Sequence, residues 1–289
     1  MPTVHLSDRA LIRVDGPDAE HFLQNIITAD IDGLQHDVAK PAALLTPQGK
    51  ILFDFLISRA GGEAFLLDVR ADLADDFIRR LMLYRLRANA KISKQEQLLV
   101  HAAWQTDSAS SETDSGSGVL QRDLRFKNAY VCRIYGEAAG ASDGRQEWDR
   151  LRIAHGVAES GPDYEAGDAF PHDVLLDQNN GIGFRKGCYV GQEVVSRMQH
   201  RGTARRRVLI VRGEAALPAS GTELTVDGRP VGTLGTVVDR DALAIARIDK
   251  VKDAIDAGAP ILAGDVQVAA SIPPGVAFGF PEPAPASEV

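Results

Sequence analysis

The chain has 289 residues, of which 44% are hydrophobic and 25% are charged. This length suggests about two domains, and the composition is that of an ordinary globular protein, so collagen-like, coiled-coil and fully disordered classes are excluded. The formal net charge of −8, from 32 basic and 40 acidic residues, argues against binding of nucleic acid or an anionic membrane by the whole molecule. Any site for a polyanion must therefore be local.

The first part of the chain mixes strands and helices. Residues 4–14 alternate as a strand does, and the Gly-Pro-Asp sequence that follows is typical of a helix start. Apolar runs at 42–45 and 51–58 flank a Pro/Gly turn, which predicts a β-hairpin. The second hairpin strand is apolar on both faces except at Asp54, where a carboxylate is costly to bury.

The middle of the chain continues the mixture of strands and helices, and the pattern changes only in the last third. A strand at 63–69 followed by an amphipathic helix at 73–84 predicts an α+β layer. Another strand at 129–135 and a short helix at 146–155 follow. From Arg206 onward, short strands separated by turn signals indicate a small all-β barrel. The predicted organisation is an α+β domain over residues 1–204, a C-terminal β-barrel over 205–280 and a disordered tail over 281–289.

Cysteine usage and the N-terminus bear on location. The two cysteines form no Cys-x-x-Cys pattern or Cys/His cluster, so neither a disulfide framework nor a zinc site is predicted, and the compartment should be reducing. The first residues have no apolar core and include several acids, which fits neither a secretory signal nor a transit peptide. No apolar run approaches the length of a membrane span, about 18 residues. These observations predict a cytoplasmic, bacterial-type protein.

The densest chemical signal lies at residues 181–193. Glycines, two cations and the thiol of Cys188 stand just before a predicted helix at 192–198. Nearby cations and the partial positive charge of a helix N-terminus favour a thiolate, so Cys188 is a candidate reactive thiol. The alternative is that Cys188 is a small buried hydrophobe and that the glycines only form a turn. Cys132 lies in an apolar strand pattern, where a structural role is expected.

This segment resembles the signature of a known family. The sequence KGCYVGQE at 186–193 matches the pattern K-G-C-[YF]-x-G-Q-E of the YgfZ family, whose mitochondrial relatives are the IBA57 proteins. The GPDA sequence at 16–19 and the QGK turn at 48–50 are similar to the family's N-terminal segment and hairpin, and the resemblance extends from residue 5 to about residue 240. Around the functional thiol Cys188, the resemblance assigns Lys186, Gly187, Tyr189, Gly191, Gln192 and Glu193 to the motif.

The resemblance implies a fold and a function. The YgfZ family is similar in fold to the folate-dependent aminomethyltransferase (T-protein) of the glycine cleavage system, in which intertwined α+β subdomains enclose a folate cavity and a C-terminal β-barrel closes one side. The resemblance implies support of iron–sulfur cluster assembly or repair, particularly in radical SAM and aconitase-type enzymes. The implied ligand is tetrahydrofolate or a derivative, including a polyglutamylated one. The implied partners are iron–sulfur client or assembly proteins, with transient cluster contact; neither a nucleic acid nor a membrane is expected.

Individual residues carry the folate part of the resemblance. Trp148 corresponds to a folate-contacting tryptophan, and its flat face suits a pterin or aminobenzoyl ring; the alternative is a core residue of an amphipathic helix. Asp54 matches the aspartate near the reacting folate nitrogens; the alternative is an edge residue or one bonded to backbone. Two positions depart from the pattern, because Arg9 replaces a second tryptophan and Ala154 replaces the pterin-binding glutamate of the transferases. Unless Glu159 substitutes, an accessory factor is expected rather than a true aminomethyltransferase.

A second local feature is basic. Between residues 185 and 207, seven basic residues accompany one acid, which predicts a patch of about +6 in an acidic chain. This patch is a candidate site for polyglutamylated folate tails, an acidic partner protein or RNA; the alternative is a solvated linker between domains. The predicted basic patch comprises Arg185, Lys186, Arg197, Arg201, Arg205, Arg206 and Arg207.

Three functions follow from these features. The first is a folate-binding accessory factor in iron–sulfur biogenesis, with Cys188 as its thiol. The second is a folate-dependent one-carbon transferase that uses Asp54, which the apparent loss of the pterin acid disfavours. The third is a module that binds RNA or a partner through the basic patch and does not need Cys188. The first is preferred, mainly because of the family resemblance.

Overall fold

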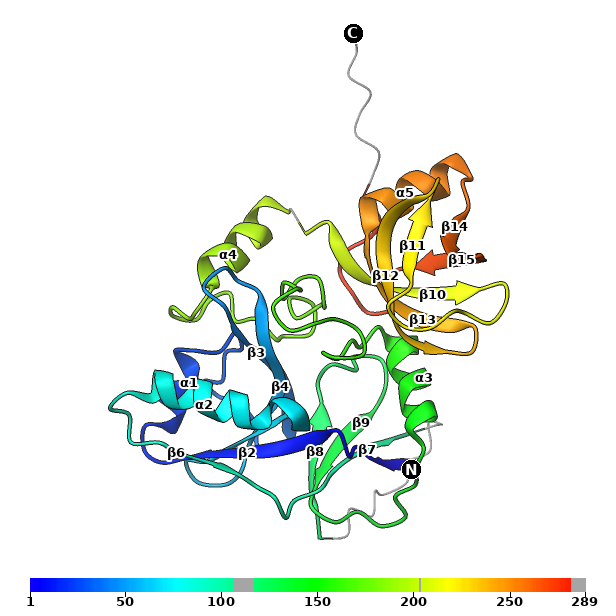
Figure 1. The fold of residues 1–289 in the computed structure, drawn as a ribbon. Helices are drawn as coiled ribbons and strands as arrows, with labels where there is room; N and C mark the ends of the chain where they lie inside the picture. The colour runs from blue at the N-terminus through cyan, green and yellow to red at the C-terminus, as the bar shows by residue number, and fades with distance from the viewer. Residues whose placement is uncertain (106–116, 203, 282–289) are drawn as a thin grey trace.

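The structure is a computed structural model that describes residues 1–105, 117–202 and 204–281. The predicted tail over 281–289 lies outside the described residues except for its first position. Figure 1 shows a larger N-terminal body, built from a sheet and helices, and a smaller C-terminal barrel that packs beside it. This is the predicted α+β fold with a C-terminal β-barrel, and the prediction is confirmed.

One nine-stranded sheet organises the N-terminal body, in the order β1-β7-β9-β8-β3-β4-β5-β2-β6. Neighbouring strands of this sheet pair antiparallel, except β3 and β8. These two strands make a short parallel contact at Val38 and Ala39, which joins the two halves of the sheet. The strands are β1 (Thr3–His5), β2 (Arg9–Asp15), β3 (Val38–Leu45), β4 (Ile51–Arg59), β5 (Phe65–Arg70), β6 (Lys91–Lys94), β7 (Val100–Trp104), β8 (Val119–Asp123) and β9 (Val131–Tyr135).

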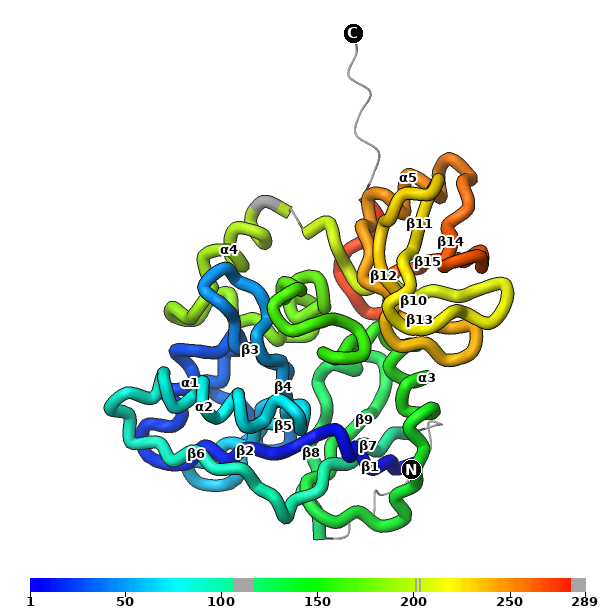
Figure 2. Tube along the Cα trace, viewed as in Figure 1, coloured from blue at the N-terminus to red at the C-terminus, as the bar shows by residue number. Residues whose placement is uncertain are grey.

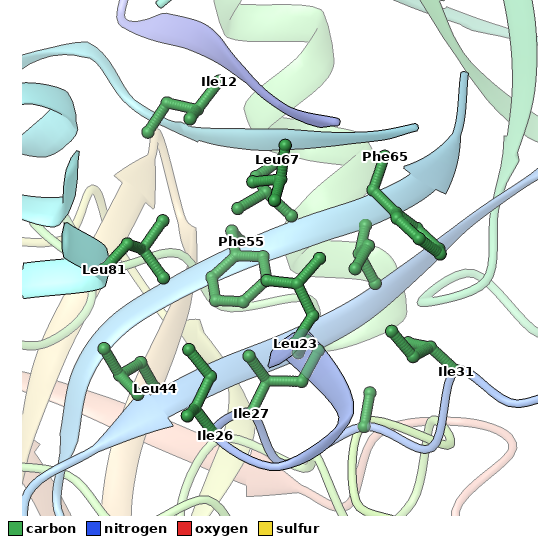
Figure 3. Close-up of a cluster of buried hydrophobic side chains, with 14 of the residues drawn as sticks. Ile12, Leu23, Ile26, Ile27, Ile31, Leu44, Phe55, Phe65, Leu67 and Leu81 are labelled. Atoms are coloured by element: carbon green, nitrogen blue, oxygen red, sulfur yellow. The ribbon is translucent and has the colours of Figure 1, made fainter. Parts of the chain in front are cut away.

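Two helices cover the half of the sheet that contains the hairpin. In α2, Phe77 and Leu81 are four positions apart and therefore share a face, on which Phe77 stacks on Phe53 with ring centroids 4.7 Å apart. Figure 3 shows how Leu23 of α1 and Leu81 of α2 lie among apolar side chains of the strands. The helices of the N-terminal body are α1 (Ala19–Gln24), the 3-10 turn η1 (Ala71–Leu73), α2 (Ala74–Arg85), α3 (Arg145–His155) and α4 (Gln192–Arg201).

The C-terminal domain is a closed six-stranded barrel with one covering helix. Its core is formed by small and branched apolar side chains, and the β11–β12 turn places Asp227 and Gly228 at positive φ, as a two-residue hairpin turn requires. The elements are β10 (Arg206–Gly213), β11 (Glu223–Val226), β12 (Arg229–Val238), β13 (Asp241–Arg247), α5 (Ile248–Ala257), β14 (Ile261–Ala263) and β15 (Val266–Ser271). The helix α5 was not predicted from the sequence.

Residues 158–191, which we call the bridging segment, contain no helix or named strand and join α3 to α4. Figure 2 shows this segment between the sheet and the barrel. Backbone hydrogen bonds connect it to both: Ile51 donates to the Ala169 carbonyl, and Val208 donates to the Asp173 carbonyl, each at 2.9 Å. In the described part of the chain, no helix is long and apolar enough to cross a membrane.

Candidate functional site

A pocket lies where the sheet, the bridging segment and the chain after the barrel meet. Its space, including the open mouth, amounts to about 710 Å³. Apolar side chains of β4 and of the bridging segment form part of the wall, and a minority of polar groups converge on it, as is typical of sites for small organic molecules. The polar side chains that line the pocket are Arg9, Asp54, Arg125, Lys127, Asn128, His155, Tyr164, Gln178 and Asn179.

The Asp54 carboxylate faces this pocket from β4. It is half-buried on the face of β4 opposite to Phe53 and Phe55, which pack in the core, and it accepts a hydrogen bond from the Ser160 hydroxyl of the bridging segment. Burial, together with this carboxylate, raises the pKa of the neighbouring Tyr164 well above its ordinary value. Asp54 is therefore a hydrogen-bond acceptor in the pocket wall, and Tyr164 remains protonated beside it.

Arginines at the floor of the pocket are held rigidly by buried acids. Arg9 donates from Nε to Asp68 at 2.6 Å, and Arg125 donates to both oxygens of Asp123 and, at 3.2 Å, to Glu159. Ion pairs of this kind leave the guanidinium groups well ordered but largely neutralised. The floor is therefore preorganised rather than strongly positive.

Glu159 is the centre of this buried network and does not line the pocket. Burial alone would raise its pKa, but Arg152, Arg125 and Arg133 outweigh that effect and hold the pKa of Glu159 well below its usual range. Its carboxylate lies 3.2 Å from Arg125 and 3.4 Å from Arg133. Glu159 therefore does not provide the pterin acid that Ala154 lacks, because its oxygens are committed to arginines.

The mouth of the pocket is bordered by the chain that leaves the barrel. Lys127 donates from Nζ to the Gly275 carbonyl at 3.0 Å, and the Ala277 amide donates to the Gln178 side chain at 2.9 Å. Within the described residues Lys127 has no acidic partner, in contrast to the arginines of the floor. The mouth thus offers an uncompensated cation to a ligand's anionic end.

Trp148 does not lie in the pocket wall. It is fully buried on the face of α3 that packs on the sheet, with ring centroids 5.5 Å from Phe126 and 6.1 Å from Trp104. The Arg133 guanidinium lies 5.2 Å from its ring centroid. The predicted stacking of a folate ring on Trp148 therefore disagrees with the structure, because core neighbours already cover the ring.

Cys188 is exposed, whereas Cys132 is buried in β9. Cys188 is not among the residues that line the pocket, so the structure does not bring the thiol and Asp54 into one cavity. The helix α4 begins at Gln192 after Gly191, where the predicted helix begins, and Cys188 lies just before it, outside the first helical turn. Its accessibility also distinguishes it from Cys132.

The other motif residues hold the loop around Cys188 in place. Lys186 donates to the carbonyls of Ile27 and Ala29, so it is not the free cation beside the thiol that was predicted. Tyr189, which belongs to the bridging segment, is buried in a core formed by apolar side chains of this segment, the β3–β4 hairpin and the barrel. Gly191 has a φ of 79° and approaches the Thr46 carbonyl, and in the structure Gly187 has open space around it. Gln192 and Glu193 open α4, where Glu193 pairs with Arg197 at 2.6 Å.

The predicted basic patch is not a continuous surface of unpaired cations. Arg207 is buried, pairs with Asp177 at 2.7 Å and lies over the Phe278 ring, and Arg206 pairs with Asp168 at 3.3 Å. Arg185 and Arg205 are exposed, whereas the side chain of Arg201 lies outside the described part of the structure. The patch is divided because Arg206 and Arg207 join the barrel to the bridging segment, whereas Arg197 pairs within α4.

Sequence reasoning missed most polar residues of the pocket. Arg125, Lys127, Gln178 and Asn179 come from irregular segments with no motif spacing, and Arg9 was noted only as a departure from a family pattern. A single hydrophilic residue in a loop contributes no periodic pattern to the sequence. Only the tertiary fold brings these side chains together.

Comparisons with known proteins identify relatives of the chain. A family model for the CAF17 C-terminal beta-barrel domain matches residues 205–278. The chain is similar to the human mitochondrial iron–sulfur cluster assembly factor IBA57, at 31% identity over 298 residues, covering 93% of this chain and 83% of that protein. The mouse IBA57 protein is 29% identical, over 86% of this chain and 78% of its own length. The Neurospora crassa homologue is 32% identical over 77% of this chain, which covers only 56% of that protein.

A solved structure with the same fold is aminomethyltransferase T of the glycine cleavage system from Bartonella henselae. The TM-score is 0.67, and the alignment covers 92% of this chain and 83% of that chain at 16% sequence identity. This likeness concerns the fold alone.

The predicted cytoplasmic location is wrong by the same comparisons. The human, mouse and Neurospora crassa relatives are all mitochondrial proteins. The prediction was based on the composition of the first residues, and a short N-terminal composition is weak evidence against relatives that align over most of the chain.

Proposed function

The chain belongs to the IBA57 family of iron–sulfur cluster assembly factors, and we propose that within this role Cys188 is the functional thiol and the pocket holds a reduced folate. The iron–sulfur cluster is the cargo in this proposal, and an assembly or client protein is the partner. The observation that carries the proposal is the exposure of Cys188 on a loop that buried contacts hold in place.

The exposed thiol suits a transient role. A thiolate is the form of cysteine that binds iron or exchanges sulfur, and it must be reachable by a partner. Cys188 meets the second requirement and Cys132, which is fully buried, does not. A single thiol is too few to hold a cluster as a resident group, and among the described residues no other cysteine, histidine or acid completes a metal-binding group with it. A cluster would therefore be shared with the partner's own ligands.

The donor set of the pocket fits a reduced folate. The N–H groups of a pterin need an acceptor in an apolar setting, which Asp54 supplies on β4, and the amides of Gln178 and Asn179 can bond ring nitrogens and oxygens. The glutamate end of folate is anionic, and Lys127 at the mouth offers it a cation. When bound, folate would supply one-carbon or reducing chemistry; the chain's own residues orient it and exclude water.

Complementation tests the function as a whole. In a strain that lacks its IBA57-family protein, this chain should restore the activity of an iron–sulfur enzyme. The Cys132→Ser variant should restore it equally, and the Cys188→Ser variant should not. Restoration by the Cys188→Ser variant would remove the thiol from the proposal, and failure of the unaltered chain would remove the assembly role.

A further inference from the structure

Lys186 connects the loop of Cys188 to a distant part of the chain. Its Nζ donates to the Ile27 carbonyl at 2.9 Å and to the Ala29 carbonyl at 2.7 Å. Backbone contacts join the same two segments, because the Gly183 amide donates to the Thr28 carbonyl at 2.8 Å. The loop at 183–188 is therefore attached to residues 27–29 by one side chain and by the main chain.

The Lys186 ammonium has few other partners. Asp30 is the acid that favours its charge, and Lys40, which donates to the Asp30 carbonyl at 2.6 Å, disfavours it. The Tyr189 ring centroid lies 5.4 Å from Nζ. Burial is the largest effect on the ammonium and lowers the pKa of Lys186 to about 8. The ammonium thus contacts carbonyl oxygens and a ring in a site where burial disfavours its charge.

We propose that Lys186 is a positioning residue, whose ammonium fixes the 183–188 loop on residues 27–29 and so determines where the Cys188 thiol lies. An ammonium has three N–H donors, so it can bind both carbonyl oxygens at once, which an apolar side chain of similar length cannot do. The consequence for cluster assembly rests on the proposed function of Cys188. The proposed position of the loop does not rest on that function, so the positioning role and the role in cluster assembly can fail separately.

A nitroxide label on Cys188 reports the loop directly. The label is attached in a Cys132→Ser background, and its mobility is measured by electron paramagnetic resonance at pH 7. In the Lys186→Met variant the label should become markedly more mobile, and in Lys186→Arg, which keeps the charge, it should stay close to the unaltered protein. Lys40→Met is the matched control, because Lys40 donates to the same N-terminal segment but does not belong to the loop. An unchanged spectrum in folded Lys186→Met would overturn the proposal.

Lys186→Gln is a second variant in case Lys186→Met does not fold. Its shorter, uncharged side chain should not reach both carbonyl oxygens, so the label should again become more mobile than in the unaltered protein and in Lys186→Arg. A spectrum of folded Lys186→Gln that matches the unaltered protein would contradict the proposal.

Complementation separates the position of the loop from its function. If Lys186→Met frees the label and also fails to restore iron–sulfur enzyme activity, both the positioning role and its functional meaning are supported. If the label is freed and activity is restored in full, the positioning role stands and the proposed need for a fixed Cys188 is overturned.

Discussion

The Ser160 hydroxyl donates a hydrogen bond to the Asp54 carboxylate, although the two residues are 106 positions apart. This contact fixes the bridging segment on strand β4 and orients the one carboxylate that strand presents to the pocket. The site therefore depends on a junction between two segments that have no relationship in sequence.

The first prediction concerns the ligand. Replacing Asp54 by Asn should weaken tetrahydrofolate binding at least about tenfold, because a charge-assisted hydrogen bond contributes roughly 1.5–3 kcal/mol. Isothermal titration calorimetry measures the affinity, with Glu63→Gln as a control, since Glu63 is exposed and outside the pocket. Equal affinities in the two variants would remove Asp54 from the site.

The second prediction separates Trp148 from ligand binding. Because Trp148 is fully buried against Phe126 and Trp104, Trp148→Phe should lower the free energy of unfolding by about 1–3 kcal/mol through lost packing. Folate affinity should be unchanged. Urea unfolding and calorimetry on the same sample check both. A loss of affinity with full stability would return Trp148 to the ligand site.

The third prediction concerns acid sensitivity. The pKa of Glu159 is lower in the folded chain than in the unfolded chain, so below about pH 4.3 the unfolded state binds the additional proton. The stabilising contribution of Glu159 is therefore present above that pH and is lost as the pH falls further. At pH 7, Glu159→Gln should cost about 1.5–3 kcal/mol, because it removes one acid shared by three buried arginines, each of which keeps another acidic partner. Urea unfolding from pH 7 to pH 3, with exposed Glu165→Gln as control, tests this. Equal losses in both variants would refute it.

The fourth prediction concerns alkaline pH. The pKa of Lys186 in the folded chain, about 8, lies below the roughly 10.4 of an unfolded chain. Above pH 8 the unfolded state binds more protons, so the Lys186 contribution to stability rises with pH, by less than about 1.4 kcal/mol per unit because the side chain is only partly buried. The difference in unfolding free energy between the unaltered chain and Lys186→Met should therefore shift in favour of Lys186 between pH 8 and about pH 9.5. No shift would mean that the ammonium is not held in a desolvated site.

The fifth prediction compares two glycines of one motif. Gly191 has a φ of 79°, and a Cβ there would lie 2.6 Å from the Thr46 carbonyl oxygen, so Gly191→Ala should cost about 1–3 kcal/mol. A Cβ on Gly187 meets nothing within 4 Å, so Gly187→Ala should change stability by less than about 0.5 kcal/mol. Thermal unfolding of the two variants is the measurement. A similar effect at both positions would show that the motif's glycines do not shape the loop.

The sequence predicted the fold class well and the site unevenly, for physical reasons. Hydrophobic periodicity predicted the β3–β4 hairpin, β5, β9, the main helices and the barrel, but it merged β1 and β2 into one strand and missed β6, β7 and β8. Asp54 was found because a charge interrupts an apolar strand. Trp148 was misplaced because periodicity reports that a helix face is buried and not whether it meets a core or a pocket. Arg207 looked like part of a basic surface because a linear count of charges ignores the buried Asp177 that pairs with it.

Reconstitution of an iron–sulfur enzyme in vitro tests whether Cys188 takes part in cluster assembly. An apo-enzyme is incubated anaerobically with ferrous iron, sulfide and a thiol reductant, and its rate of activation is followed with and without this chain. If the exposed thiol takes part in cluster assembly, the unaltered chain and Cys132→Ser should accelerate activation equally, and Cys188→Ser should not. Equal acceleration by Cys188→Ser would contradict the claim that the exposed thiol takes part in cluster assembly.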